Sequence, residues 1–171
     1  TRAKGGDEYR GDEGPLKVST GPMKNPLFRA FIEAGQQAGY ARTDDMNGFQ
    51  QEGFGPMDMT IHQGQRWSAA TAYLKPARAR PNLTVETRAL TSRVLLEKGR
   101  AVGVEYRQGG QVKTARAERE EILCGGTINS PQLLMLSGIG NTDELRQAGV
   151  DSTHHLPGVG KNLQDHLELW I

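Results

Sequence analysis

The sequence predicts a mixed helix-and-strand chain of the α+β or α/β class. Three observations predict it: a helical apolar pattern after residue 25, three short strands separated by glycine turns within residues 92–117, and a strand, a glycine pair and a helix in succession over residues 121–140. The 171 residues suffice for one domain with a core or for parts of two.

The N-terminal part predicts one short strand and one helix. Residues 1–14 are polar and rich in glycine, which is typical of an extended or poorly ordered segment. The alternation of Leu16 and Val18 predicts a short strand after it. Asn25 before Pro26 is a helix-start signal, because the first turn leaves its N–H groups unpaired and proline has none. One apolar face is expected to continue to Gly39: Leu27, Phe28, Phe31, Ile32 and Ala34.

Residues 41–66 are expected to form a loop, and residues 67–79 a second helix that ends before Pro81. Four residues of this helix share a face: Trp67, Ala70, Tyr73 and Leu74. The basic run KPARARP over 75–81 suits either a solvated helix end or a nucleic-acid patch. The balanced charge, 21 Lys and Arg against 20 Asp and Glu, favours the helix end and indicates no nucleic-acid partner.

From residue 82 the pattern changes to strands. Leu83 and Val85 alternate with polar residues and predict a strand over residues 82–89. Residues 92–117 predict three short strands. Two glycine-containing pairs mark the turns between them: Lys98 with Gly99, and Gly109 with Gly110.

A short apolar strand, a glycine pair and a helix are expected over residues 121–140. Ile122, Leu123 and Cys124 form the strand, and Pro131 is expected near the first turn of the helix. Three leucines supply its buried side and two glycines end it: Leu133, Leu134 and Leu136, then Gly138 and Gly140.

The glycine pair has two interpretations. A helix N-terminus behind glycines presents free N–H groups and a positive dipole end, which suit the polar groups of a dinucleotide. From this geometry alone we favour the other interpretation, a tight strand-to-helix turn. The dinucleotide fingerprint Gly-x-Gly-x-x-Gly occurs nowhere in the sequence.

Residues 141–171 predict a short helix, a turn and a strand. Asn141 and Glu144 have the spacing of a capping box, and Gly149 follows the helix end. The final segment, VGKNLQDHLELWI, is expected to pass from a turn into a strand.

Cysteine usage excludes an internal disulfide framework, and hydropathy excludes an apolar run long enough to span a bilayer. The single cysteine, Cys124, excludes an internal disulfide framework and is expected to be a small buried residue, not a nucleophile. No apolar run approaches the ~20 residues that span a bilayer. Because the first residue is not methionine, we expect both ends to be cuts in a longer protein.

Residues 125–140, GGTINSPQLLMLSGIG, resemble the second signature of the glucose/methanol/choline (GMC) family of flavoprotein oxidoreductases. Nine residues stand where that motif requires them: Gly126, Ser130, Pro131, Leu133, Leu134, Ser137, Gly138, Ile139 and Gly140. RPNLTVETRALTSRVLLEKGRAVGVEY resembles the β-meander on the adenine side of the family, and LPGVGKNLQDH its loop after the signature helix. DEYRGDEGPLKV and EAGQQAGYARTDDMNGFQQEGFGPMD resemble the bacterial choline-oxidising members.

The resemblance implies an incomplete FAD-binding domain, Rossmann-like and of the GMC type with a β-meander, plus part of a substrate-binding domain. It assigns residues 1–81 to the substrate-binding domain and connecting helices, residues 82–140 to the FAD-binding domain, and residues 141–171 to a return towards the substrate domain. The family's closing active-site histidine motif is not in the sequence and is not matched by any of the four histidines: His62, His154, His155 and His166. We therefore expect an internal fragment that holds no catalytic residue.

The function implied by the resemblance belongs to a longer parent protein. That protein is expected to oxidise choline to betaine aldehyde, and on towards glycine betaine, by hydride transfer to FAD. Its electrons are expected to pass to an acceptor other than oxygen, in the cytoplasm or at the inner face of the bacterial cell membrane. The 171-residue chain alone is expected neither to retain FAD nor to oxidise choline.

Four cofactor-binding residues follow from the resemblance. Val94 matches the position whose main chain contacts the adenine of FAD; the alternative is an inward-facing strand residue. Gly125, Gly126 and Thr127 match the segment near the adenosine half. Ser130 and Pro131 are expected to form the turn and the helix start.

The substrate-side residues are expected in the tail. Side chains alternate in a strand, so His166, Glu168 and Trp170 share one face and Asp165 turns inward on the other. A carboxylate beside an aromatic ring suits a quaternary ammonium ion such as choline. The resemblance implies that Glu168 faces the trimethylammonium group and that His166 lies near the active site.

Other interpretations stay open. A metal site of Asp165, His166 and Glu168 is disfavoured by the alternation, and no metal is expected. In a structural interpretation, Asp165 bonds local backbone and His166 is bonded in a core. The parent could act on another alcohol, or the chain could be a non-catalytic truncation that self-associates, with exposed edges that cause oligomerisation or distortion near residues 82–124.

Overall fold

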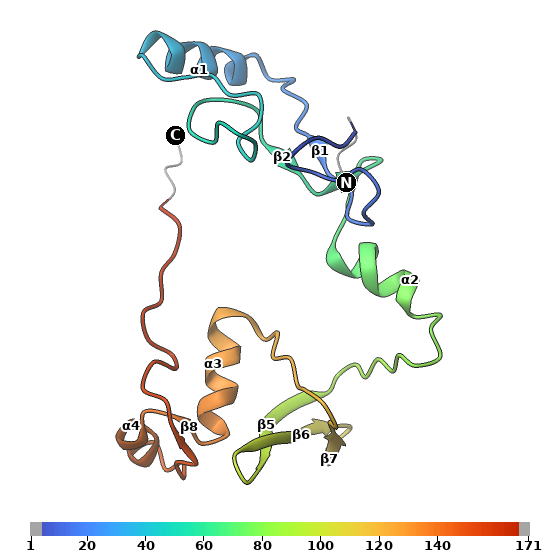
Figure 1. The fold of residues 1–171 in the computed structure, drawn as a ribbon, viewed down its shortest axis with the longest axis vertical. Helices are drawn as coiled ribbons and strands as arrows, with labels where there is room; N and C mark the ends of the chain where they lie inside the picture. Colours follow the sequence, from blue (N-terminus) through green and yellow to red (C-terminus); the bar gives the residue numbers. More distant parts are fainter. Residues whose placement is uncertain (1–4, 168–171) are drawn as a thin grey trace. The chain divides into compact units, whose positions relative to one another are not determined.

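The computed structural model describes residues 5–167. Its contacts divide the chain into two units, Thr1–Val85 and Glu86–Ile171 (Figure 1). The division falls after Val85, whereas the resemblance placed a domain boundary after residue 81. The assignment of these parts to substrate-binding and FAD-binding domains stays a prediction.

The described part of unit 1, residues 5–85, contains one full-length helix and several two-residue strands. The strands pair antiparallel, β1 with β2 and β3 with β4. Two short helical segments, η1 and α2, end the unit. The bounds of its elements are β1 (Ser19–Thr20), α1 (Pro26–Gln37), β2 (Asp58–Met59), β3 (Ile61–His62), β4 (Gln65–Arg66), η1 (Ala70–Leu74) and α2 (Lys75–Ala77).

Helix α1 begins where the sequence predicts. The side chain of Asn25 accepts the N–H of Leu27, so it caps the first turn. Near the end of the helix, Gly35 lets the ring of Phe54 approach, since a Cβ on this glycine would lie 2.6 Å from that ring. Ile32 is buried on the same side. The expected apolar face is only partly covered: Leu27, Phe28 and Phe31 are all exposed.

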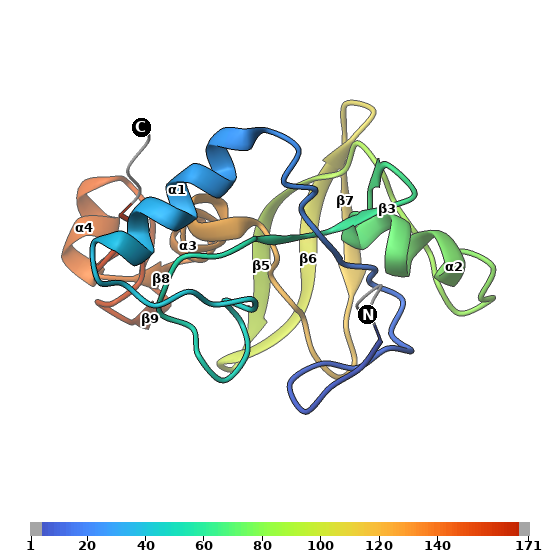
Figure 2. The same cartoon turned by 90° about the horizontal axis from the view of Figure 1, so that it is seen from above.

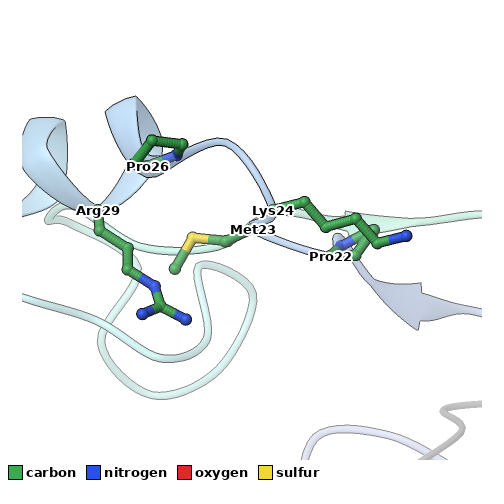
Figure 3. A pocket seen from close by; sticks show the side chains of 5 residues that line it. All are labelled: Pro22, Met23, Lys24, Pro26 and Arg29. Carbon is green, nitrogen blue, oxygen red and sulfur yellow. The ribbon is translucent and has the colours of Figure 1, made fainter.

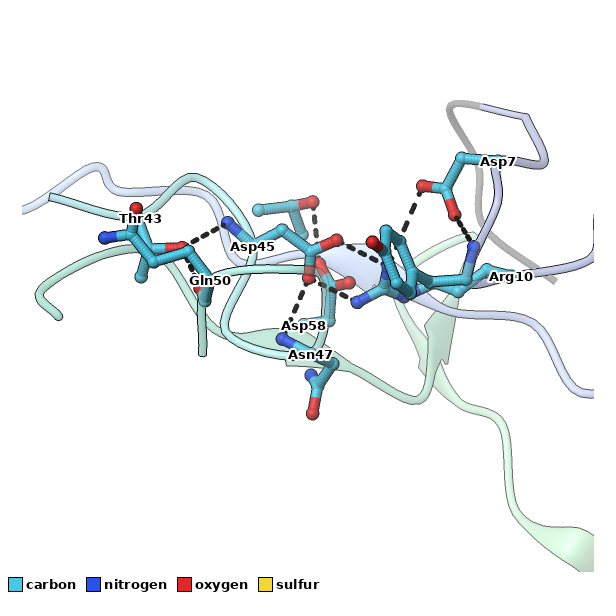
Figure 4. A network of polar contacts seen from close by, with 9 residues as sticks. Asp7, Arg10, Thr43, Asp45, Asn47, Gln50 and Asp58 are labelled. Atoms are coloured by element: carbon cyan, nitrogen blue, oxygen red, sulfur yellow. Dashed lines mark hydrogen bonds and ion pairs between the residues drawn. The ribbon is translucent and has the colours of Figure 1, made fainter. Parts of the chain in front are cut away.

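The polar N-terminal segment is held in place by Arg10. Residues 7–10 form a tight turn in which Asp7 and Arg10 bridge, and the guanidinium of Arg10 makes a two-pronged ion pair with Asp45 (Figure 4). Asp45 also accepts the N–H of Asn47, and the hydroxyl of Thr43 donates to the carbonyl of Gln50 at 2.8 Å. The expectation of a poorly ordered or merely extended segment is therefore wrong for residues 7–10.

The second helix is shorter than predicted and starts later. Its first turn is a π-helix, Ala70–Leu74, followed by three α-helical residues. Trp67 lies before the helix and so shares no helical face. Its indole N–H donates to the carbonyl of Pro15 at 2.8 Å. The side chain of Ser68 accepts the N–H of Thr71 at the start of this segment.

Unit 2 is built on an antiparallel meander, in which β5, β6 and β7 lie side by side in chain order (Figure 2). The predicted turns are confirmed: Lys98 and Gly99 have φ of 52° and 78°, as a two-residue hairpin turn requires. Helix α3 packs against β5. The elements are β5 (Leu90–Glu97), β6 (Arg100–Gln108), β7 (Gln111–Arg116), α3 (Gly126–Leu136), β8 (Ile139–Gly140), α4 (Thr142–Gln147) and β9 (His154–His155).

Two predicted strands do not form. Residues 82–89 are irregular, as are residues 121–124. Ile122 is 76% exposed and Cys124 is exposed as a free thiol, so the expectation of a buried cysteine is wrong. Within residues 82–124 the meander itself is regular apart from two shifts of register in β5, and the irregular parts are those on either side of it.

Helix α3 starts earlier than predicted. It begins at Gly126, so Pro131 lies inside the helix and neither Ser130 nor Pro131 starts it. Leu136 is 51% exposed and does not belong to a buried side. The end is as expected, since Ser137 is the C-cap and Gly138 follows with φ of 82°.

Leu145 of α4 is buried and lies beside Gly140 of β8. Asn141 caps this helix by accepting the N–H groups of Asp143 and Glu144, as predicted. The side chain of Glu144 does not return the bond and instead pairs with Lys161 at 2.7 Å. Residues 161–167 form no strand, and Asp165 is exposed, not turned inward. Glu168 and Trp170 lie outside the described residues.

Candidate functional site

The N-terminus of α3 is open to an approaching ligand. Gly125 is its N-cap and makes no side-chain capping bond. Gly126 has φ of 83°, and a Cβ built on it meets no atom within 4 Å. Thr127 is exposed in the same turn. A side chain at Gly126 would therefore enter open space, whereas a Cβ on Gly125 would lie 3.1 Å from the Cβ of Asn129. The first N–H groups of an 11-residue helix are of the kind that suits the polar groups of a dinucleotide.

A cavity of about 510 Å³ lies beside this turn, within unit 2. Its walls come from β5, β6, the segment 121–125 and α3, and most are apolar. Gly125 and Cys124 line it, whereas Val94 does not. The lining residues are Leu90, Thr91, Val104, Glu121, Ile122, Leu123, Cys124, Gly125, Asn129, Gln132, Leu133 and Leu136.

Val94 is buried, and its main-chain N–H donates to the hydroxyl of Ser137 at 2.8 Å. That hydroxyl donates in turn to the carbonyl of Leu133 at 2.6 Å. The N–H of Val94 is therefore occupied inside the protein. A ligand contact through its main chain would fall to its carbonyl oxygen.

Leu90 and Thr91 are the cavity residues of β5, and the sequence interpretation named neither as a site residue. The pairing of β5 with β6 shifts by one position between Thr91 and Arg93, which is a β-bulge. Simple alternation counted from Val94 therefore gives the wrong face for Thr91. Regular pairing outwards from the turn at Lys98 and Gly99 would not locate this shift, because the observed register already departs from it between Leu95 and Leu96.

In the described part of the tail, Asp165 accepts the N–H of His166 at 2.9 Å and bonds local backbone. His166 is exposed. Within residues 5–167, no three His, Cys, Asp or Glu side chains gather as metal ligands would. Glu168, the third residue of the metal alternative and the proposed partner of choline, lies outside that range.

A second hollow, of about 410 Å³, lies beside the start of α1 (Figure 3). Lys24 and Arg29 line it together with Pro22, Met23 and Pro26, and its lining includes no carboxylate. Two cationic side chains repel a quaternary ammonium ion. This hollow is therefore unsuitable for choline.

A shift in acidity is found on the meander, away from the cavity lining. The hydroxyl of Ser92 donates to Glu105 at 2.8 Å and lowers the pKa of that carboxyl, with partial desolvation opposing the change and Arg93 supporting it. Arg93 pairs with the other oxygen at 3.0 Å.

Among the described helices, none has the length and apolarity to cross a membrane.

Comparison with known proteins gives one family over nearly the whole chain. A family model described as GMC oxidoreductase matches residues 6–168. The mitochondrial choline dehydrogenase of Homo sapiens is 64% identical over 167 residues, which cover 98% of this chain and 28% of that protein. The oxygen-dependent choline dehydrogenase of Chromohalobacter salexigens is 56% identical over 173 residues, 100% of this chain and 31% of that protein.

Solved structures have the same fold. Pyridoxine 4-oxidase from Mesorbium loti superimposes with a TM-score of 0.85 at 37% identity, covering 91% of this chain and 31% of that one. An FAD-dependent oxidoreductase from Chaetomium thermophilum has a TM-score of 0.80 at 26% identity, covering 87% and 26%. The chain thus spans less than a third of the length of these relatives.

Proposed function

The chain belongs to the GMC oxidoreductase family, and we propose that the longer protein containing it is an FAD-dependent choline dehydrogenase. The similarity to choline dehydrogenases over almost all of the chain carries this proposal. The reaction is the oxidation of choline to betaine aldehyde, and on towards glycine betaine. FAD, when bound, supplies the acceptor for the hydride that leaves the alcohol carbon.

The open turn at the start of α3 fits part of this cofactor. Gly125, Gly126 and Thr127 would hold polar groups of the adenosine half through their main-chain N–H groups, because Gly126 has no side chain and unfilled space beside it. Val94 would contribute its carbonyl oxygen, which can accept from an amino group, since its N–H is bonded to Ser137. The main-chain roles of all four residues are part of the proposal.

The substrate is proposed to meet Glu168 and His166. Choline carries a fixed positive charge that cannot donate a hydrogen bond, so a carboxylate is the natural counter-charge. The match of Glu168 to the family position that faces the trimethylammonium group supports this role. His166 is proposed to lie near the reacting alcohol.

The variant Glu168→Gln in the full-length protein tests the substrate role. The KM for choline should rise at least tenfold, while an uncharged alcohol of the same shape should change little. Glu33→Gln, at an exposed position on α1, is the matched control and should leave both values unchanged. Equal effects of Glu168→Gln on both alcohols would exclude a charge-specific role.

We also propose that residues 1–171 alone neither retain FAD nor oxidise choline. The Gly-x-Gly-x-x-Gly loop that would hold the pyrophosphate is not in this sequence. The purified chain should show protein absorbance without a flavin band. One flavin per chain after gel filtration would contradict the proposal.

The electron acceptor and the location are two further parts of the proposal. The bacterial relative is named oxygen-dependent and the human one is not. We propose an acceptor other than oxygen, in the cytoplasm or at the inner face of the cell membrane. Choline-driven reduction of a soluble dye should exceed oxygen uptake by the same sample, and cell fractionation should place the enzyme in one of those two fractions. Oxygen uptake equal to dye reduction would overturn the choice of acceptor.

A further inference from the structure

The hydroxyl of Ser137 binds two main-chain groups at once. It accepts the N–H of Val94 at 2.8 Å and donates to the carbonyl of Leu133 at 2.6 Å. A hydroxyl has a single proton, and here Leu133 receives it, so the oxygen faces Val94 only as an acceptor. Because Ser137 and Val94 are both buried, water does not compete for this bond.

The bond determines which way the main chain of Val94 faces. Val94 lies opposite Val104 in the antiparallel pairing of β5 with β6. In such a pairing a residue either exchanges both main-chain hydrogen bonds with the residue opposite or points both groups away from it. Because the N–H of Val94 donates to Ser137, its carbonyl oxygen also points away from β6, towards the side of β5 where α3 packs.

Ser137 is itself held at the end of α3. Its main-chain N–H donates to the carbonyls of Leu133 and Leu134 at 3.1 and 3.0 Å. Its own carbonyl accepts the hydroxyl of Thr153, directly before β9, at 3.2 Å. These bonds give the hydroxyl a defined position on α3, so Ser137 orients Val94 and does not merely follow it.

The same bond joins two walls of the cavity of about 510 Å³. Thr91 lines the cavity from β5, and Leu136 lines it from the end of α3. Ser137 directly follows Leu136, so its bond to Val94 holds the two walls together at this end of the helix. Gly125, at the other end of the same helix, belongs to the turn proposed to hold the adenosine half of FAD.

We propose that Ser137 is a positioning residue for FAD in the full-length protein. Its hydroxyl orients the main chain of Val94 so that the Val94 carbonyl accepts a hydrogen bond from the amino group of the adenine. This inference rests on the proposed function, in which Val94 meets the cofactor through that carbonyl. Ser137 itself does not touch the cofactor and acts on it only through Val94.

A purely structural role for Ser137 gives a different expectation. If the bond only stabilised unit 2, its loss would weaken the binding of every flavin dinucleotide by the same factor. If the bond orients the carbonyl of Val94, its loss weakens only a dinucleotide whose purine carries the amino group. The two roles are therefore separated by comparing two dinucleotides that differ at this group.

The test measures the dissociation constants of two flavins from the full-length apoprotein by the change in their fluorescence. One is FAD, and the other is its analogue with hypoxanthine in place of adenine, which has a carbonyl oxygen where the amino group stands. The unsubstituted protein should bind FAD about tenfold more tightly than the analogue, which corresponds to one hydrogen bond. In Ser137→Ala this preference should fall below about threefold, because only FAD loses a contact.

Asn141→Ala is the matched control. The side chain of Asn141 caps the first turn of α4 and bonds no group of β5 or α3 that the structure describes, so its loss destabilises unit 2 elsewhere. This variant should keep the full preference for FAD. If Ser137→Ala does not fold, Ser137→Cys gives the same readout, because a thiol is a weak acceptor of similar size.

A preference for FAD that survives in the Ser137 variant would overturn the positioning role, even if both flavins bind more weakly. Equal affinities of the unsubstituted protein for the two flavins would contradict the Val94 contact of the proposed function, and this inference with it. The measurement involves no choline, so a different alcohol substrate would leave the inference intact.

Discussion

The main-chain N–H of Val94 and the side-chain hydroxyl of Ser137 are joined by a hydrogen bond of 2.8 Å across 43 residues of sequence. Both residues are buried. The bond connects the middle of β5 with the C-cap of α3, and the same hydroxyl donates to the carbonyl of Leu133. Ser137 thus fixes the helix end to the strand, and with it one wall of the cavity.

Replacing Ser137 by alanine should weaken unit 2. The buried N–H of Val94 would lose its acceptor, which costs about 1–3 kcal/mol of unfolding free energy. Urea unfolding followed by circular dichroism measures this loss. Ser130→Ala, in the same helix, is the control and should cost less than about 0.5 kcal/mol, because no hydrogen bond of the Ser130 side chain is found among the described residues. A similar loss in both variants would exclude a specific role for Ser137.

Gly138 should tolerate alanine less well than Gly149. Both have a positive φ, 82° and 73°, so alanine is strained at each by about 1–2 kcal/mol. At Gly138 a Cβ would also lie 2.5 Å from the carbonyl oxygen of Asp151, whereas at Gly149 nothing lies within 4 Å. Gly138→Ala should therefore lower the melting temperature clearly more than Gly149→Ala. Equal decreases would show that the contact with Asp151 relaxes freely.

The ion pair of Arg10 with Asp45 should stabilise unit 1 more than that of Arg42 with Asp44. The side chain of Arg10 is 16% exposed and that of Arg42 is 52% exposed, so water screens the second pair more. Arg10→Ala should cost about 1–3 kcal/mol, and Arg42→Ala no more than about 1 kcal/mol. The rate of proteolysis within residues 5–20 reports the release of this segment. Equal rates in the two variants would contradict the difference.

The hydroxyl of Ser92 should control the acidity of Glu105. Because the hydrogen bond from Ser92 lowers the pKa of this carboxyl, Ser92→Ala should raise that pKa towards its usual range. A folded pKa below the unfolded value stabilises the fold above about pH 4.3, and this contribution is lost as pH falls through the folded pKa. Titration by carbon-detected NMR measures the pKa directly. An unchanged value in Ser92→Ala would assign the shift to Arg93.

Local signals predicted much of the fold. The mixed helix-and-strand class, the turns of the meander at Lys98 and Gly99, and the cap of α1 at Asn25 all depend on residues close together in sequence. Such signals need no distant partner. They were therefore confirmed by the structure.

The wrong predictions concern which segments find a strand to pair with and which face of a strand a residue lies on. Residues 82–89 and 121–124 have strand-like patterns, but a strand forms only where another strand accepts its hydrogen bonds. The bulge after Thr91 reverses the alternation in β5, so the pattern did not identify Thr91 as a cavity residue. The bond from Val94 to Ser137 joins residues too far apart for any periodicity to predict it.

Flavin reduction tests most directly the proposal that the longer protein is an FAD-dependent choline dehydrogenase. The full-length protein should be purified with FAD, and choline added without oxygen. Choline should bleach the absorbance of the oxidised flavin in one rapid phase, whereas an uncharged alcohol of the same shape should do so at least tenfold more slowly. An unchanged flavin spectrum with choline, together with rapid bleaching by the uncharged alcohol, would contradict a choline dehydrogenase.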